Sequence, residues 1–318
     1  MAKQYITDLK EGQAIDSTFV VRNKQMKQKK NGEPFMSLEL VDKTGFLPAN
    51  MWDNLNNDLK NNDFVKVTGT VGSFAGKPQG TVKELKIIQP GEVELADFLP
   101  ATEKNIEEMF QIVEKAVKGI KDEYLQKLLN DFLADQEFVN AFKKAPAALG
   151  MHNAYIGGLL EHVVELIDLA GFICQKYKDI NKDILMTGII LHDAAKIKEY
   201  QYETTIDYTD WGRLVGHNVM GIQMIDEKIK NIPGFPDQLH MVLAHLILSH
   251  HGIAEWGSPK QPMTLEAVVL HYLDNMEAKI AGFQQFTEKN IQEGTPWTTK
   301  AFMFDNRHLY VPQDNSKE

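Results

Sequence analysis

Residues 191–200 read LHDAAKIKEY and set His192 directly beside Asp193. Ile189 and Ile190 precede the pair, and apolar residues recur at roughly helical spacing, so the whole segment is predicted to be helical with one face in a core. An imidazole and a carboxylate are costly to bury unless they are paired or bound to a metal. The pair therefore predicts a site of chemistry at the edge of a helical core.

The sequence around this pair predicts an all-α domain. From Thr102 onward, apolar residues recur at i, i+3 and i+4 almost to the end of the chain, for example in residues 106–120 and 153–177. The expected segments are a connector at 91–104, a helical domain at 105–300 with its core at about 155–280, and a C-terminal hairpin or tail at 301–318.

The first part of the chain, residues 1–90, predicts an all-β domain. Met36, Leu38 and Leu40 alternate with more polar residues, as a half-buried strand requires. Five short strands in fewer than a hundred residues are typical of a small closed barrel of the oligonucleotide-binding (OB) type. The strands are expected within residues 19–42, 43–52 and 63–88, with turns at Asn31-Gly32 and around Gly72 and Gly76.

The histidines form an ordered set within the helical part. Ten occur, and all of them follow residue 151. Each one alone is readily explained as a core or surface histidine, but burying many imidazoles and carboxylates in one core costs several kcal/mol per charged group unless they are paired or metal-bound. Imidazole and carboxylate donors without thiolates suit Mn²⁺, Fe²⁺ or Mg²⁺ better than a closed structural zinc site. Beside the His192-Asp193 pair, the set comprises His162, His217, His250, His251 and Asp274.

This order of residues resembles the HD-domain metal-dependent phosphohydrolases. The stretch HDAAK, with Lys196 three residues after Asp193, resembles the extended HD-x-x-K form of the motif. The stretches HNAYIGGLLEHVVEL, GRLVGH and LSHHG, together with the OB-type N-terminal part, resemble the YhaM-type 3′→5′ exoribonucleases of Gram-positive bacteria. The resemblance covers nearly the whole chain.

The resemblance implies two divalent ions per site, with Mn²⁺ the expected metal and Fe²⁺ or Mg²⁺ as alternatives. Asp193 would bridge the two ions, because a carboxylate offers two oxygens. His251 is open between a ligand and a residue that orients a ligand or the substrate. The other implied ligands are His162, His192 and Asp274 for the first ion, and His217 and His250 for the second.

Two cationic residues are candidates for contact with a phosphate group. Lys196 follows Asp193 by one helical turn, so its ammonium would neutralise a non-bridging phosphate oxygen and act with Asp193 in catalysis. A solvated lysine at a helix end is the alternative. Arg213, four residues before His217, is the second candidate.

The barrel offers candidate contacts to a nucleic-acid strand. Single-strand binding without sequence preference needs cations for phosphates and exposed aromatic faces for bases. The alternatives are a solvated edge for the lysines and the barrel core for the aromatic residues. No RNP-like aromatic motif supports readout of a specific base sequence. The candidates are Lys24, Lys27, Lys29, Lys30, Phe35, Trp52 and Phe74, with Phe46 as a further aromatic residue.

Charge and composition set the remaining expectations. The net charge is −10, but residues 1–90 hold 13 Lys and Arg against 10 Asp and Glu, while the remainder holds 21 against 34. This asymmetry is compatible with an anionic ligand at the first part and metal at the second, and equally with a solvated surface. A single cysteine, Cys174, excludes an intramolecular disulfide framework. The chain lacks a run long enough to span a membrane and a secretory leader, so a cytoplasmic location is expected.

The set of histidines and carboxylates itself predicts metal-assisted hydrolysis of a phosphoester, and the resemblance to the YhaM-type enzymes implies a metal-dependent 3′→5′ exonuclease. It would degrade single-stranded RNA, with single-stranded DNA as a second substrate, and release nucleoside 5′-monophosphates. Two alternatives stay open: a phosphodiesterase of small or cyclic nucleotides, and a single-strand-binding protein whose helical domain is a scaffold. The resemblance also implies a homo-oligomer.

Overall fold

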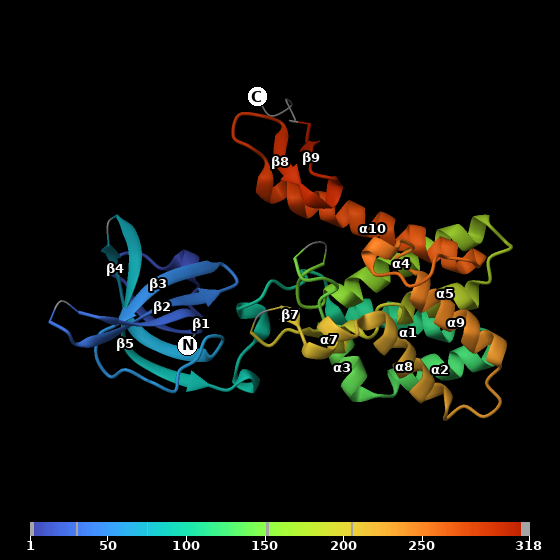
Figure 1. Cartoon of the computed structure of the whole chain (residues 1–318), viewed down its shortest axis with the longest axis horizontal. Coiled ribbons are helices and arrows are strands. Elements are labelled where there is room, and N and C mark those ends of the chain that lie inside the picture. Colours follow the sequence, from blue (N-terminus) through green and yellow to red (C-terminus); the bar gives the residue numbers. More distant parts are fainter. Residues whose placement is uncertain (1–2, 30, 75, 151–152, 205, 313–318) are drawn as a thin grey trace. The chain divides into compact units, whose positions relative to one another are not determined.

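The structure is a computed structural model that describes residues 3–29, 31–74, 76–150, 153–204 and 206–312. It divides into two compact units (Figure 1), one comprising Met1–Ala101 with Tyr202–Ile206 and the other Thr102–Gln201 with Asp207–Glu318. The division at Ala101 falls within the connector predicted at 91–104. The first unit holds a five-stranded closed barrel and the second is helical, which confirms the predicted fold class.

The barrel has the strand order β1-β2-β3-β5-β4 and closes because β1 pairs with both β2 and β4. All of these pairings are antiparallel except that of β3 with β5, which is parallel. A five-stranded barrel with this connectivity is of the OB type. The strands are β1 (Ala14–Gln28), β2 (Pro34–Asp42), β3 (Gly45–Met51), β4 (Phe64–Phe74) and β5 (Lys77–Ile88).

Side-chain alternation builds the barrel core. Along β2, Met36, Leu38 and Leu40 are buried while their neighbours are partly exposed. Gly69 lets β4 and β5 approach closely, because a Cβ there would lie 2.2 Å from the carbonyl oxygen of Thr81. Gly72 lies inside β4 and not in the connection, so its predicted turn is wrong. β4 continues past Gly72, because its pairing with β5 extends to Phe74 and Lys77.

The helical unit packs four of its longer helices around the histidine set: α4 contacts α5 and α10, and α5 contacts α9. Gly188 lets α5 approach α9, because a Cβ there would lie 2.3 Å from a methyl carbon of Leu246. The helices are α1 (Ile106–Lys118), α2 (Glu123–Leu133), α3 (Gln136–Lys144), α4 (Gly158–Lys176), α5 (Lys182–Leu191), α6 (Lys196–Glu199), α7 (Asp210–Leu214), α8 (His217–Ile229), α9 (Asp237–Ser249) and α10 (Leu265–Asn290).

Two short hairpins complete this unit. One pairs β6 (Tyr200–Gln201) with β7 (Asp207–Tyr208). The other follows α10 and pairs β8 (Trp297–Ala301) with β9 (Arg307–Tyr310), as Figure 1 shows. Its turn passes through Asp305 and Asn306, both with positive φ, at the position predicted for a hairpin turn. The last residues of the predicted tail, 313–318, lie outside the described residues.

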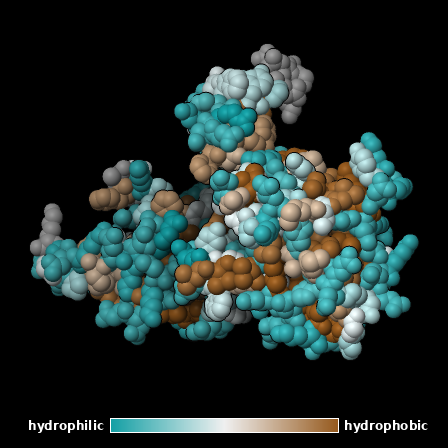
Figure 2. Space-filling model, turned by 45° about the vertical axis from the view of Figure 1, so that its right-hand side comes forward, coloured by the Kyte–Doolittle hydropathy of each residue, from teal (hydrophilic) through white to brown (hydrophobic). Residues whose placement is uncertain are grey.

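Hydrophobic side chains interrupt the hydrophilic surface in several patches (Figure 2). They include an exposed stripe on α10 formed by Val268, Tyr272, Met276 and Ile280. Within the described ranges, no helix has the length and apolar character needed to cross a membrane.

Candidate metal centre

The His192-Asp193 pair lies where a helix ends and not within one. α5 ends one residue before His192, and α6 begins after a turn over 192–195, so the continuous helix predicted for residues 191–200 is wrong. The imidazole Nδ1 of His192 donates to the carbonyl oxygen of Ile189 at 2.8 Å, which draws the ring back over the last turn of α5. Neighbours on one helix would point about 100° apart. The turn instead lets both side chains face inward, with exposed fractions of 0% and 2%.

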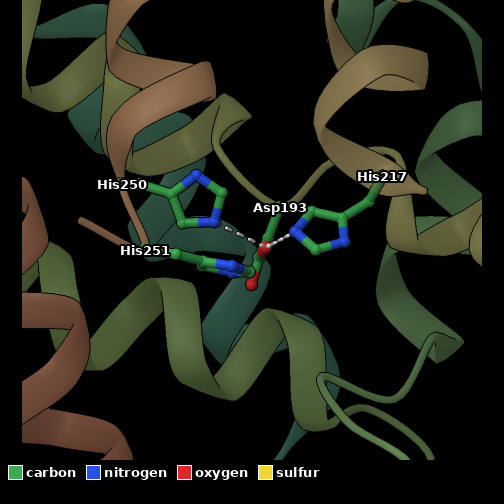
Figure 3. Close-up of side chains that lie close together, drawn as sticks. All are labelled: Asp193, His217, His250 and His251. Carbon is green, nitrogen blue, oxygen red and sulfur yellow. Dashed lines mark ion pairs between the residues drawn. The ribbon is translucent and has the colours of Figure 1, made fainter. Parts of the chain in front are cut away.

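The rest of the set converges on Asp193 from four other elements. His162 lies in the second turn of α4, His217 is the first residue of α8, and Asp274 lies in α10. His250 and His251 follow α9 directly, so this helix has also ended before its histidine pair. Figure 3 shows His217, His250 and His251 around the Asp193 carboxylate. The structure therefore brings together all seven residues that the sequence analysis selected as metal ligands.

One carboxylate oxygen of Asp193, Oδ2, faces two imidazoles. It lies 3.4 Å from His192 Nε2 and 3.9 Å from His162 Nε2. The two Nε2 atoms are 3.3 Å apart. Asp274 Oδ1 adds a second carboxylate at 3.2 Å from His162 Nε2 and 4.0 Å from His192 Nε2. These four side chains form the first half of the site.

The other oxygen of Asp193, Oδ1, faces a different pair of imidazoles. It lies 3.4 Å from His217 Nε2 and 3.6 Å from His250 Nε2, as the dashed lines in Figure 3 mark. One ring nitrogen of His251 belongs to the same group of potential ligand atoms, all within 4.8 Å of one another. Asp193 is thus shared by both halves, one oxygen to each.

Every histidine of the set has its Nδ1 occupied, which turns its Nε2 toward the centre. Each Nδ1 lies 2.6 to 2.9 Å from an oxygen acceptor. A partner of this kind fixes ring orientation and tautomer in metal-binding histidines. The acceptors are Glu277 for His162, Glu199 for His217, and the carbonyl groups of Ile189, Ile247 and Trp256 for His192, His250 and His251.

The donor set fits a divalent metal. Among the described residues, Asp193 Oδ1, His217 Nε2 and His250 Nε2 are buried polar atoms without a hydrogen-bond partner. Buried polar atoms normally have a hydrogen-bond partner, and a site for a bound ion is one of the accepted explanations when they do not. All three atoms are lone-pair donors that face one point, and a set of nitrogen and oxygen donors without sulfur suits a divalent cation.

Asp193, His250 and His251 have the charge states that metal ligands need. Burial alone would raise the pKa of Asp193, but the Lys196 ammonium and the neighbouring imidazoles hold it well below its usual value. Burial and the neighbouring rings His250 and His217 lower the pKa of His251 to about 3. Burial likewise lowers the pKa of His250. At neutral pH the carboxylate is therefore ionised and these two imidazoles are free to donate lone pairs.

His162 differs, and its proton gives a testable prediction. Burial lowers its pKa, but the carboxylates of Asp274 and Glu277 outweigh burial and raise it to about 10. Below that pH the ring is an imidazolium, so a cation that takes Nε2 must displace a proton. We expect metal binding at pH 7.5 to release about one proton per chain from this ring, and metal affinity to weaken as pH falls. Calorimetric titration of Mn²⁺ in buffers of different ionisation enthalpy measures the release, and a buffer-independent heat would contradict it.

Lys196 and Arg213, the predicted phosphate contacts, lie in different surroundings. The Lys196 ammonium is buried and donates to Asp193 Oδ2 at 2.6 Å, and this carboxylate overcomes the effect of burial and raises the lysine pKa. Lys196 is therefore charged and belongs to the cluster. The Arg213 guanidinium is more than half exposed and pairs with Asp207 at 2.7 Å.

Four of the predicted nucleic-acid contacts on the barrel lie near one another. Phe35 and Trp52 stack at a centroid distance of 4.5 Å, and Trp52 is 38% exposed. Lys27 pairs with Phe35 in the β1-β2 ladder, and the Lys29 ammonium lies 3.9 Å from Asp53, beside Trp52. We call Lys27, Lys29, Phe35 and Trp52 the β1-β2 patch.

The other barrel candidates lie outside this patch. Phe74 is 70% exposed and lies at the end of β4, in the β4-β5 hairpin. The Lys24 ammonium binds the backbone carbonyl groups of Asn57 and Leu59. Phe46 is also exposed. Lys30 lies outside the described residues.

Comparison with known proteins identifies the family. Residues 159–279 match the HD domain family, and this range contains every candidate ligand. A 3′-5′ exoribonuclease YhaM from Geobacillus sp. (strain WCH70) is 32% identical over 305 residues, which cover 95% of this chain and 93% of the relative. The enzyme of the same name from Bacillus velezensis is 32% identical over 305 residues, covering 95% and 96%. The chain belongs to the YhaM family of 3′-5′ exoribonucleases.

The resemblance to HD-domain and YhaM proteins predicted from the sequence is thereby confirmed. Among solved structures, the barrel of this YhaM-family chain is similar to the second OB-fold domain of replication protein A from Methanococcus maripaludis. That similarity covers 28% of this chain and 96% of the other, with 23% identity and a TM-score of 0.24.

Two carboxylates behind the site were not among the residues selected from the sequence. Glu277 lies 2.6 Å from His162 Nδ1, and Glu199 accepts from both the backbone N–H and the Nδ1 of His217. The spacing of Glu277, three residues after Asp274 on one helix, was a usable signal for a shared face. Glu199 had no such signal, because α6 is a single turn separated from α8 by a hairpin and α7.

We expect Glu199→Gln and Glu277→Gln each to weaken metal affinity about 10- to 100-fold, because each removes the acceptor that orients a ligand imidazole. Calorimetric titration with Mn²⁺ measures the effect. The matched control is Glu203→Gln, since Glu203 is exposed and close in sequence to Glu199. Unchanged affinity in both variants would show that the two carboxylates do not hold the ligands.

Proposed function

We propose that this protein is a metal-dependent 3′→5′ exoribonuclease that degrades single-stranded RNA to nucleoside 5′-monophosphates. The observation that carries the proposal is the division of the Asp193 carboxylate between two groups of imidazoles, in a chain of the YhaM exoribonuclease family. A shared carboxylate is the usual bridge in two-metal phosphodiesterases, whose ions lie about 3.5–4 Å apart. Single-stranded DNA is the second substrate that the same chemistry serves.

The proposed cofactor is a pair of divalent ions, with Mn²⁺ favoured over Fe²⁺ and Mg²⁺. When bound, such ions supply Lewis acidity toward the phosphate and lower the pKa of a coordinated water. His251 would complete the second group, since its Nδ1 is held by Trp256 and its ring lies 4.1 Å from that of His250. The remaining assignments are His162, His192, Asp193 and Asp274 for one ion, and Asp193, His217 and His250 for the other.

The side chains of this protein would prepare the site for a phosphodiester. Lys196 keeps a buried positive charge against Asp193, where it offsets the negative charge of an approaching phosphate. Glu199 and Glu277 keep their imidazoles in place. Arg213 remains the second candidate for phosphate contact. Its guanidinium would have to leave Asp207 before it could contact a phosphate.

The barrel would hold the strand whose 3′ end is at the metals. In the β1-β2 patch, the exposed indole of Trp52 would supply a stacking surface and Lys27 positive charge, the combination that binds single strands without sequence preference. The Lys29 ammonium would have to leave Glu33, at 3.2 Å, to contact a phosphate. Phe74 offers a second exposed ring on another hairpin. A homo-oligomeric state and a cytoplasmic location complete the proposal.

We expect Trp52→Ala and Phe74→Ala each to weaken RNA binding by about five- to a hundredfold, because each removes one base-stacking surface. Fluorescence anisotropy of a labelled single-stranded RNA, with EDTA to prevent cleavage, measures the affinity. The control is Phe172→Ala, because Phe172 is 72% exposed but lies on α4 of the helical unit. Equal losses in all three variants would indicate that these rings contribute only general surface hydrophobicity.

Product analysis tests the reaction itself. Single-stranded RNA is incubated with the protein and Mn²⁺, and the products are separated by ion exchange. The expected result is release of nucleoside 5′-monophosphates from the first time point. Internal fragments or nucleoside 3′-monophosphates would contradict the proposal. Faster hydrolysis of cyclic dinucleotides than of RNA would favour a small-nucleotide phosphodiesterase instead.

A further inference from the structure

Solvent reaches the metal-ligand cluster on the side of Asp274 and His251. The side chains of Asp274 and His217 are 16% and 11% exposed, whereas those of His162, His192, Asp193 and His250 are at most 3% exposed. His251 is only partly buried. A phosphodiester must approach a buried cluster through its most accessible members. In the proposed reaction, the groups next to Asp274 and His251 would therefore meet the nucleotide being removed.

Trp256 is held next to His251. It ends a short 3-10 helix, Ala254–Trp256, in the loop that follows the His250-His251 pair. His251 Nδ1 donates to the Trp256 carbonyl oxygen at 2.7 Å. The following residue, Gly257, accepts from the side-chain amide of Asn218, the neighbour of His217, at 3.2 Å. The loop is thus tied to both histidine-bearing segments of the second group.

The Trp256 indole is available to a ligand. It is 45% exposed although its backbone is fixed by hydrogen bonds, so the ring is presented to solvent from a rigid base. Gly257 makes the turn that closes the loop with φ of +86°, a conformation that favours glycine. A ring that is already placed loses little entropy on stacking against a base.

A lysine next to this ring matches the charge of a nucleic-acid backbone. The Lys279 ammonium lies over the Trp256 ring, 5.9 Å from the ring centroid. Lys279 is five residues after Asp274 on α10, and its ammonium also binds the carbonyl oxygen of Met303. An exposed aromatic face beside a cation is the combination that binds single-stranded nucleic acid without base preference.

We propose that Trp256 is the stacking surface for the base at the 3′ end of the strand, the nucleotide that is removed in each cycle. This inference rests on the proposed exonuclease function and adds a subsite to it. Stacking on a fixed indole would hold the terminal nucleotide while its phosphodiester lies at the metal-ligand cluster. Because every base has a π-face, the subsite accepts all four nucleotides.

The test compares two single-stranded RNAs that differ only at the 3′-terminal nucleotide, which is either normal or abasic. Removal of this nucleotide is followed with the wild type, Trp256→Ala and Trp256→Phe in the presence of Mn²⁺.

For the normal RNA, Trp256→Ala should raise KM about five- to a hundredfold, with kcat and Mn²⁺ affinity retained. Trp256→Phe should recover most of the lost affinity. For the abasic RNA, Trp256→Ala and the wild type should have the same KM. Trp297→Ala, which removes a 46% exposed indole from β8, is the control and should behave as the wild type.

Each contrary result has a distinct meaning. If Trp256→Ala raises KM for both RNAs by the same factor, or for neither, the ring does not hold the terminal base and the inference is overturned. If Trp297→Ala matches the loss in Trp256→Ala, the effect is unspecific and the inference is overturned as well. If the wild type cleaves neither RNA, the proposed exonuclease function itself fails.

Discussion

The Asp193→Asn variant is expected to degrade RNA at least about a thousandfold more slowly than the wild-type chain, a loss of roughly 4 kcal/mol of transition-state stabilisation. Asp193 supplies one oxygen to each half of the cluster, at 3.4 Å from His192 Nε2 and 3.4 Å from His217 Nε2. Replacing it with Asn keeps the shape of the side chain but removes the charge on which both proposed metal positions would depend. Initial rates on a labelled RNA and the Mn²⁺ content of the purified protein measure the two effects.

The Asp193→Asn variant also leaves the Lys196 ammonium buried without its carboxylate, which destabilises the fold. Circular dichroism and thermal unfolding therefore have to show that the variant is folded at the assay temperature. Asp226→Asn is the matched control, because it removes a carboxylate that lies 2.7 Å from His240 Nε2 on the exposed surface of α8. Wild-type rates in Asp193→Asn would contradict the bridging role.

The Lys196→Met variant is expected to lose about 10²- to 10³-fold in kcat while keeping its affinity for Mn²⁺. The charged ammonium lies 2.6 Å from Asp193 Oδ2, where it competes with a cation for the same oxygen. Removing it therefore leaves metal binding as strong as before or stronger. The rate falls because the positive charge that would offset the phosphate is gone. A ligand variant behaves differently, since it loses metal and activity together.

Lys198→Met is the control for this variant, because Lys198 lies on the same short helix and is exposed. Calorimetric Mn²⁺ titration and kcat are measured for both variants. If Lys196→Met loses Mn²⁺ affinity in parallel with activity, the role of Lys196 is only to hold the Asp193 carboxylate in place. Unchanged kcat would remove it from the catalytic residues.

The barrel could be predicted from the sequence because its signal is local. The alternation of apolar and polar residues along 34–42 places one face of β2 in the core, and glycines in the sequence indicate candidate turns. Which aromatic residues are exposed was not predictable. Phe19 and Phe64 are fully buried in the barrel while Phe46 and Phe74 are exposed, yet all four lie in strands of similar composition. Their placement depends on the strand register and closure that the structure provides.

The convergence of these seven side chains could be predicted because their chemistry is unusual: histidines and carboxylates recur in apolar helical surroundings that normally exclude them. The local geometry could not. LHDAAKIKEY has helical spacing, but the helix ends at Leu191 and the turn at 192–195 sends His192 and Asp193 to one point. The same happens at His250 and His251, where α9 ends at Ser249. Tertiary contacts decide where these helices end. The helical spacing of apolar residues in the sequence does not reveal those contacts.

The most direct test of the account uses single-stranded RNA labelled at its 5′ end, incubated with the wild type and with Asp193→Asn, in Mn²⁺ and in EDTA. We expect a ladder of labelled products that shortens from the 3′ end, present only for the wild type in Mn²⁺. Intact RNA in the wild-type Mn²⁺ reaction, or the same ladder in EDTA, would contradict a metal-dependent 3′→5′ exoribonuclease centred on Asp193.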